Sequence, residues 1–399
     1  MITNGGDTTG APFGRTVATL ALVGMVVVGQ MYVTIPLMPQ IGVVWHISQE
    51  AATWATSAFA LGYAVGSLTS GYLSKRHDIR VLMTGSIVLM AFVTALVPIA
   101  TGLGGGSALR AAQGFLAGTF LPMAYSYLNA RIPSRRIPLA LTTVSCALGG
   151  TVVAGQAQAQ LLTAGFGWRS VFWLTAPVLV IGAVIAWKVL LPGPGGRPAA
   201  APPRGTSRLR RLIPLYLVAL VVAGSLTGIY TGVQLYGPGQ LVTDHGAMLA
   251  LRASALPGLL VTVLLAPVLG AVAALLRAAG GFVVAGVGML AAALFVDSAV
   301  GLGAALLVFV MGISVVSPAI VQTVGAAAGA RQSVAIALYD LMLNLGSAAG
   351  VHLPSLLPDL ADLAALIAGI IGVGAVIVLL SVGLSRRRGP ARPVRYSTS

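Results

Sequence analysis

Long apolar runs alternate with short polar stretches along the whole chain. Runs of about 20 residues or more lie near 16–38, 51–73, 81–100, 106–128, 138–160, 169–191, 213–235, 248–275, 281–298, 300–322, 333–355 and 361–384. A helix needs roughly 20 apolar residues to cross a bilayer. The pattern therefore predicts an all-α integral membrane protein with about twelve transmembrane helices.

Composition supports a protein that works in lipid. Of the 399 residues, 57% are hydrophobic and only 8% are charged, whereas soluble domains are about 25% charged. The net charge of +15 comes from short stretches between the apolar runs. That distribution follows the positive-inside pattern of membrane proteins and argues against nucleic acid as a partner. The single cysteine, Cys146, excludes an intramolecular disulfide and a Cys-rich metal site.

The basic residues also predict an orientation. With the N-terminus inside, cytoplasmic segments contain all of the 23 Lys and Arg residues except Arg110, Arg169 and Arg252. Excess Lys and Arg in short connections marks the cytoplasmic side. We therefore expect a multi-pass protein of a bacterial cytoplasmic (inner or plasma) membrane, with both termini in the cytoplasm. The polar N-terminal segment lacks a signal-peptide cleavage pattern, so the first span is expected to be retained.

The chain divides near its middle. Residues 192–212 are rich in Pro, Gly and Arg, which is typical of a flexible linker. Gly71 and Arg131 recur as Gly270 and Arg331 at an offset of about 200 residues, which indicates duplicated halves. We predict a tail at 1–15, a six-helix half at 16–191, the linker, a pseudo-symmetric six-helix half at 213–384, and a tail at 385–399. Two such halves around a central cavity are a transporter architecture.

Three motifs resemble the major facilitator superfamily. The loop 71–80, GYLSKRHDIR, is similar to the signature G-x-L-[A/S]-D-[R/K]-x-G-[R/K]-[R/K]. Its matching residues are Gly71, Leu73, Ser74, Arg76 and Arg80, while Lys75, Asp78 and Ile79 depart from the pattern. Arg110-Ala111-Ala112-Gln113-Gly114 resembles R-x-x-Q-G of the fourth span, and Gly167-Trp168-Arg169 resembles the turn between spans five and six. The resemblance implies a twelve-helix transporter that works by alternating access.

The signature loop is a candidate gate. We expect Gly71, Lys75, Arg76, Asp78 and Arg80 to act there, with cationic side chains pairing with helix C-termini and acidic partners. Because Lys75 replaces the acid of the family pattern, Asp78 can restore the pairing with Arg76 or Arg80. The alternative is a solvated loop that only sets topology.

Ionisable residues at membrane depth are costly and usually functional. Asp340, about nine residues beyond Arg331, is a candidate proton carrier or substrate ligand, and Asn344 shares its helix face. A structural role for Asp340 beside the signature loop remains equally open. Arg110 is the second candidate for proton coupling, as the resemblance implies, and its alternative is an interfacial arginine. Arg252 is expected to be interfacial.

A set of amides and phenols is expected to line a substrate cavity. Pro36 and Pro39 can break the first helix where it meets that cavity. The candidate cavity residues are Gln30, Tyr32, Gln113, Tyr125, Gln156, Gln160, Tyr230, Gln234 and Asn344. Such a lining suits an uncharged or amphipathic ligand, although hydrogen bonds between helices are an equal alternative for any one residue.

These features predict a secondary transporter and no enzyme. The four histidines are scattered, and no P-loop is present, so we expect neither cofactor nor metal. The favoured function is proton-coupled efflux of a small organic compound, and the alternative is proton-coupled uptake of a metabolite. Span five lacks the Gly-Pro typical of drug–proton antiporters in this superfamily. The expected partners are the small-molecule substrate, protons and the lipid bilayer, with the protein a monomer.

Overall fold

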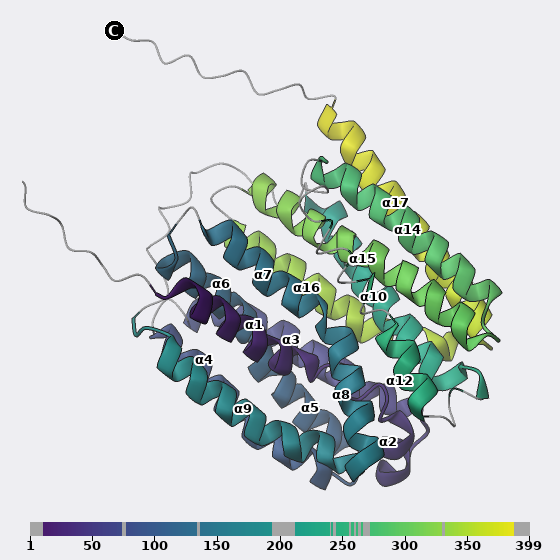
Figure 1. The fold of residues 1–399 in the computed structure, drawn as a ribbon, viewed down its shortest axis with the longest axis horizontal. Helices are drawn as coiled ribbons and strands as arrows, with labels where there is room; N and C mark the ends of the chain where they lie inside the picture. Colours follow the sequence, from purple (N-terminus) through teal and green to yellow (C-terminus); the bar gives the residue numbers. More distant parts are fainter. Residues whose placement is uncertain are drawn as a thin grey trace, which may run out of the picture.

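The computed structural model describes residues 11–73, 77–133, 136–193, 212–239, 241, 245–254, 257–258, 261, 265, 272–328 and 332–386. Every regular element in this part of the chain is helical (Figure 1). Lys75, Arg76, Arg331, most of the 192–212 linker and the ends of both tails lie outside the described residues.

The first half contains nine α-helices in the described ranges. They are α1 Phe13–Gly29, α2 Met38–Trp45, α3 Trp54–Leu73, α4 Ile79–Leu96, α5 Leu103–Gly118, α6 Phe120–Arg131, α7 Ile137–Gly149, α8 Thr151–Phe166 and α9 Arg169–Val189. The second half contains α10 Ile213–Tyr236, α12 His245–Ala253, α14 Ala274–Leu294, α15 Ala299–Ala328, α16 Gln332–Gly350 and α17 Leu360–Arg386. Short 3-10 turns occur at η1 Ala51–Thr53, η2 Val97–Ile99 and η6 Pro354–Leu356.

Six helices in the described ranges are long and apolar enough to cross a membrane. They cover Ile79–Ile99, Arg169–Val189, Ile213–Tyr236, Ala274–Leu294, Ala299–Ala328 and Leu360–Ser381. Their outer faces expose large apolar side chains, such as Phe92, Val283 and Leu380. An apolar exterior on helices that satisfy their own backbone hydrogen bonds is what a bilayer requires.

Three of the predicted spans are interrupted within the described residues. The first span ends as a helix at Gly29, and the chain continues through turns to α2 beyond Pro36. The fourth is interrupted at Thr119, between α5 and α6, where Pro122 lacks the N–H that would bond back across the break. The fifth is interrupted at Gly150. Hydropathy averaged over a window treats each of these as one span because none of the breaks contains a charged residue.

Glycines allow helices to pack with backbones in direct contact. A Cβ on Gly62 would lie 2.1 Å from the carbonyl oxygen of Ala111, and a Cβ on Gly114 would lie 2.0 Å from that of Phe59. Gly66 and Gly118 repeat these contacts one turn further along. The α3–α5 contact is therefore a seam of small residues spaced four apart on both helices, as in other membrane helix pairs.

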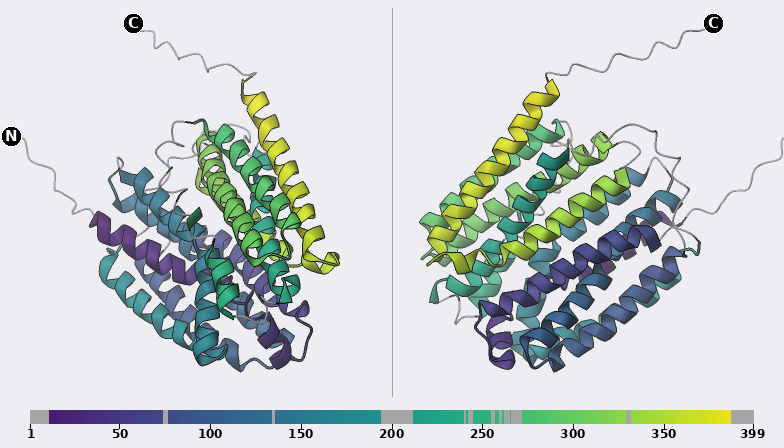
Figure 2. Two further views of the ribbon diagram at one scale, coloured as in Figure 1. Left: turned by 45° about the vertical axis from the view of Figure 1, so that its right-hand side comes forward. Right: turned by 180° about the vertical axis from the view of Figure 1, so that it is seen from behind.

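The helices form two groups that lie side by side, the first half in purple to teal and the second in green to yellow (Figures 1 and 2). Each group has its own apolar core. Close glycine contacts recur at equivalent places, between Gly29 of α1 and Gly155 of α8, and between Gly224 of α10 and Gly346 of α16. Both pairs join the first and fifth spans of their halves.

Candidate functional site

The two halves contact one another at the end of the bundle away from the loop between α3 and α4. Ser57 Oγ, near the start of α3, donates a hydrogen bond of 2.8 Å to the carbonyl oxygen of Ala348 in α16. His352, just beyond α16, places Nε2 2.8 Å from Ser57 Oγ and Nδ1 3.1 Å from Thr53 Oγ1. We call Thr53, Ser57, Ala348 and His352 the latch.

The latch contains no carboxylate and has an aromatic wall. The ring centroids of His352 and Trp54 are 4.8 Å apart. Burial lowers the pKa of His352, because desolvation disfavours the charged ring. Because the Ser57 hydroxyl donates to the Ala348 carbonyl, it accepts from Nε2–H of the ring. A neutral ring then requires Thr53 Oγ1 to donate to Nδ1 in place of the Glu50 carbonyl oxygen, which lies 2.5 Å away.

Arg252 makes a second contact between the halves at the same end. Its guanidinium donates to the side-chain oxygens of Gln160 in α8 and Gln234 in α10. Arg252 is 1% exposed, which corrects the expectation that it lies at the membrane interface. In the sequence Arg252 follows an outer loop closely. In the fold its helix, α12, packs between α8 of the first half and α15 of the second.

Arg110 holds the broken end of α1. Its Nη2 donates to the carbonyl oxygens of Gln30 at 2.8 Å and Met31 at 3.4 Å, and its Nε donates to that of Ala55 at 3.2 Å. The Gln30 and Met31 carbonyls follow the end of α1, so they lack the helical N–H partners that a continuous helix would supply. Arg110 also contacts Gln113 Oε1, and the amide nitrogen of Gln113 donates to Thr94 Oγ1.

This arrangement gives Arg110 a fully buried, well-bonded position rather than an interfacial one. The guanidinium lies 4.5 Å above the Phe59 ring. All of its hydrogen-bond acceptors among the described residues are neutral. Through these contacts Arg110 links the segment that follows α1 to α3 and α5, and its role in proton coupling stays a prediction.

Asp340 lies in α16 among tyrosines from both halves. Its side chain is 8% exposed, and its Oδ2 atom makes no hydrogen bond of normal geometry. The equally unbonded hydroxyl of Ser67 in α3 lies close enough to stabilise the charged carboxylate. It is within electrostatic range of Tyr32, Tyr63 and Tyr339. Tyr125, another candidate cavity residue, belongs to the same cluster through Tyr63 and Tyr339.

The remaining amides divide into bonded and unbonded groups. Asn344 donates to the backbone oxygen of Asp340 at 2.7 Å, so this amide serves its own helix. The side-chain nitrogen and oxygen of Gln30, the oxygen of Gln156 and the hydroxyl of Tyr230 are buried without a partner. Gln30 and Gln156 each follow a glycine of the close contact between Gly29 of α1 and Gly155 of α8.

The signature loop differs from the expected pairing. Asp78 caps α4 by accepting from the Arg80 backbone N–H at 2.8 Å, and its other oxygen accepts from Gly193 N at 2.8 Å. The Arg80 guanidinium lies 3.9 Å from the Trp187 ring of α9. Helix capping and stacking therefore replace an Asp78–Arg80 ion pair and fasten helices within the first half. Gly71 lies in the last turn of α3, and Lys75 and Arg76 lie outside the described residues.

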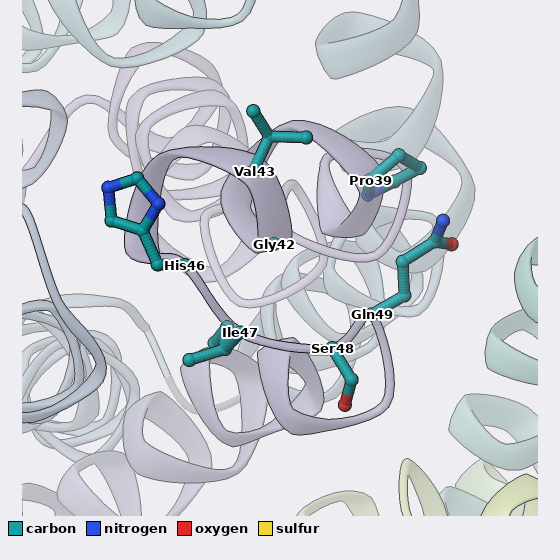
Figure 3. Close-up of a pocket in the computed structure, with 7 residues that line it drawn as sticks. All are labelled: Pro39, Gly42, Val43, His46, Ile47, Ser48 and Gln49. Carbon is teal, nitrogen blue, oxygen red and sulfur yellow. The ribbon is translucent and has the colours of Figure 1, made fainter.

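A surface hollow of about 530 Å³ lies beside α2 (Figure 3). It is lined by Pro39, Gly42, Val43, His46, Ile47, Ser48 and Gln49. All seven belong to one short stretch of the first half. The hollow therefore lies apart from the contacts between the halves.

The structure adds four residues that sequence reasoning missed: Tyr63, Arg252, Tyr339 and His352. A signal existed for Arg252, since it is one of three basic residues that break the charge pattern. Tyr339 precedes Asp340 in the sequence. Tyr63 and His352 carry no local signal, because only the approach of α3 to α16 brings them to the interface.

The comparisons with known proteins agree on one family. The family model described as Major Facilitator Superfamily matches residues 20–351. The chain is 29% identical over 138 residues to the fatty acid resistance protein FarB of Neisseria gonorrhoeae, covering 35% of this chain and 27% of that protein. It is 27% identical over 144 residues to the tetracenomycin C resistance and export protein of Streptomyces glaucescens, with 35% and 27% covered.

A third relative is the multidrug resistance protein MdtG of Dickeya zeae, 30% identical over 145 residues, with 36% of this chain and 35% of that protein covered. The chain thus matches about a quarter to a third of the length of these relatives. The crystal structure of the human organic anion transporter MFSD10 (TETRAN) superposes with a TM-score of 0.70 at 15% identity, covering 92% of this chain and 99% of that one. At this identity the likeness concerns the fold. With a family model matching most of its length and a solved structure sharing its fold, this chain belongs to the Major Facilitator Superfamily.

Proposed function

We propose that this protein exports a small organic compound by proton-coupled alternating access of its two halves, residues 16–191 and 213–384. The observation that carries the proposal is the buried carboxyl of Asp340, whose Oδ2 atom makes no hydrogen bond, where α16 of the second half contacts α3 of the first. Gln30, Gln156 and Tyr230 also have buried polar atoms without hydrogen bonds. A buried polar group without a hydrogen bond is costly, so these groups are best explained as partners for a transient ligand.

Export is favoured over uptake by the names of the relatives. They are named for fatty acid resistance, for tetracenomycin C resistance and export, and for multidrug resistance. Each name describes protection from a small organic compound. An interior of amides and phenols between apolar walls suits such compounds, because a few hydrogen bonds fix the orientation while apolar contact supplies affinity.

The latch supports alternating access. It joins α3 of the first half to α16 of the second through neutral hydrogen bonds. Such bonds are individually worth only about 1 kcal/mol net, so they can be exchanged for water when the halves separate. Closure at one end and opening at the other is the motion expected of paired membrane repeats.

Asp340 is the proposed proton carrier. It is the buried carboxyl of the described chain, it lies at the contact of α16 with α3, and one oxygen makes no hydrogen bond of normal geometry. Tyr32 and Tyr63 from the first half approach it. Gain or loss of a proton there changes the charge between the two halves, which is how a proton can bias their arrangement.

The test is transport by the purified full chain in liposomes with an acidic interior. A panel of lipophilic drugs and small metabolites is added outside, and compound and protons are followed together. Accumulation of a compound while protons leave establishes antiport, the reaction that exports the compound from a cell. Movement of compound and protons in the same direction establishes the uptake alternative, and transport indifferent to the pH gradient contradicts proton coupling.

A further inference from the structure

Arg252 is a buried cation without a negative partner among the described residues. It is 1% exposed, and its contacts there are the neutral amides of Gln160 and Gln234. Its Nε atom is buried and has no acceptor. The Tyr230 hydroxyl, one helical turn before Gln234, is also buried without a partner and lies within electrostatic range of the guanidinium.

A charge held in this way is poorly compensated. Removing a guanidinium from water costs several kcal/mol, and neutral acceptors recover only part of that cost. Arginine presents a planar fork of donors whose geometry matches two oxygens of one carboxylate. The amide oxygens of Gln160 and Gln234 occupy two N–H groups of that fork, where a carboxylate would supply both acceptors and the missing charge.

The position suits a ligand as well as the chemistry. Gln160 belongs to the first half, whereas Gln234 and Arg252 belong to the second. Val152 and Val153 of α8 pack into the apolar core of the second half, so apolar surface lies on the α8 side of the same interface. A charged side chain inside a membrane bundle commonly marks the path of a substrate.

We propose that Arg252, with Tyr230, Gln160 and Gln234, forms a subsite for the carboxylate of an amphipathic organic anion. The anion takes the place of the Gln160 oxygen on the guanidinium, and the Tyr230 hydroxyl donates a further hydrogen bond to it. Release of Gln160 removes the hydrogen bond that its side chain makes between α8 and α12. Ligand binding therefore loosens a contact between the halves. This inference rests on the proposed transport function and assigns its substrate class.

The test compares three ligands with the same alkyl chain: decanoate, 1-decanol and decyltrimethylammonium. Binding to the full chain in nanodiscs is measured at pH 8, with empty nanodiscs as the background, and uptake is measured in proteoliposomes. A charged, bidentate hydrogen bond lost from a buried site corresponds to roughly 10- to 100-fold in affinity. We expect Arg252→Gln to weaken decanoate binding by that factor and to leave decanol binding unchanged.

Two further variants keep the test decisive. Tyr230→Phe preserves the ring and removes the hydroxyl, so it should weaken decanoate binding about 2- to 10-fold even if Arg252→Gln fails to fold. Arg169→Gln, on an exposed arginine stacked on Trp168, should leave the binding of all three ligands unchanged.

Several outcomes would overturn the inference. Tightest binding of decyltrimethylammonium, or equal weakening of all three ligands by Arg252→Gln, would show that Arg252 is structural. Asp244 lies outside the described residues. If Asp244→Asn also weakens the binding of all three ligands equally, Arg252 forms an ion pair with Asp244 and is not a ligand site. Transport of decanol or the cation without preference for decanoate would refute the anion subsite and leave the transport proposal standing. Selective decanoate binding without uptake would support the anion subsite and contradict the transport proposal.

Discussion

Three charged side chains in the described part of the chain are buried, and each meets a different environment. Arg110 has neutral acceptors on several of its nitrogens, Arg252 has one nitrogen unpaired, and Asp340 has one oxygen unpaired. Satisfied groups rigidify a structure, whereas unsatisfied ones are where a ligand or proton can gain most. The proposed chemistry therefore rests on Arg252 and Asp340, while the role of Arg110 in proton coupling stays a prediction.

Replacing Asp340 by Asn removes the proton site while preserving shape. We expect Asp340→Asn to abolish accumulation driven by a pH gradient and to leave exchange of labelled for unlabelled substrate intact, because exchange needs no net proton movement. The matched control is Asp297→Asn, on an exposed turn between α14 and α15. Unchanged accumulation in Asp340→Asn would reduce Asp340 to a structural residue.

His352 makes the latch sensitive to pH. Because burial lowers its pKa below the ordinary value of 6.5, the latched state disfavours the charged ring. The latch is therefore fully stable above about pH 6.5 and weakens as the pH falls through the lowered pKa. Spin labels at the exposed positions Val43 and Leu356, in a Cys146→Ser background, should move apart on acidification.

The corresponding control is His352→Gln, which can still form hydrogen bonds but cannot titrate in this range. Its label distances should not respond to pH. Distances that respond equally in both proteins would assign the pH dependence to another group.

The residues that could be predicted from sequence are those that interrupt an apolar run. Asp340 and Arg110 stand out in this way, and both are buried. Arg252 was predicted to be interfacial from its position near an outer loop, but position along the sequence does not show how deeply a residue is buried among the helices. His352 follows the end of a helix. Its hydrogen-bond partners, Ser57 and Thr53, lie about 300 residues earlier, so the sequence around it does not indicate a role.

At the scale of helices, glycine seams determine how closely elements approach. The α3–α5 seam leaves no space for a methyl group at Gly62 or Gly66, since a Cβ would come within 2.1 Å of backbone oxygen at each. Backbone cannot move aside as a flexible side chain can, so overpacking there separates the helices.

Gly62→Ala should destabilise the protein by about 1–3 kcal/mol, measured as a lower temperature of thermal unfolding in detergent. Gly85→Ala on α4 is the matched control, because no atom outside the local helix lies within 4 Å of its added Cβ. Equal unfolding temperatures for the two variants would show that the α3–α5 contact relaxes freely.

Sequence predicted the apolar elements better than their interruptions. The length of the apolar runs predicted the six long helices, because the hydrophobic thickness of a bilayer requires that length. A break in the first span was predicted at Pro36 and Pro39, whereas the helix already ends at Gly29. The breaks at Thr119 and Gly150 were not predicted, because they contain no charged residue and depend on neighbouring helices for support.

At the scale of the molecule, the latch predicts that transport requires separation of α3 from α16. In a Cys146→Ser background, a Ser57→Cys/Ala348→Cys pair should form a disulfide, because the serine oxygen lies 2.8 Å from the Ala348 backbone. Oxidation should stop transport and reduction should restore it. The matched pair, Val23→Cys/Gly182→Cys, lies within the first half, where a Cβ added to Gly182 would be 3.4 Å from a methyl group of Val23.

Cross-linking the control pair should leave transport unchanged, since both positions move with one half. Full transport by the oxidised Ser57/Ala348 variant would exclude opening at the latch as part of the cycle.

The neutral character of the latch has a consequence for the energy of switching. Its contacts are made by hydroxyl, imidazole and carbonyl groups, with no ion pair among the described residues. Dissolved ions screen charges but leave neutral hydrogen bonds almost untouched. Opening of the latch therefore requires only hydration of a small polar surface. We expect the free energy of opening to be the same at high and at low salt concentration.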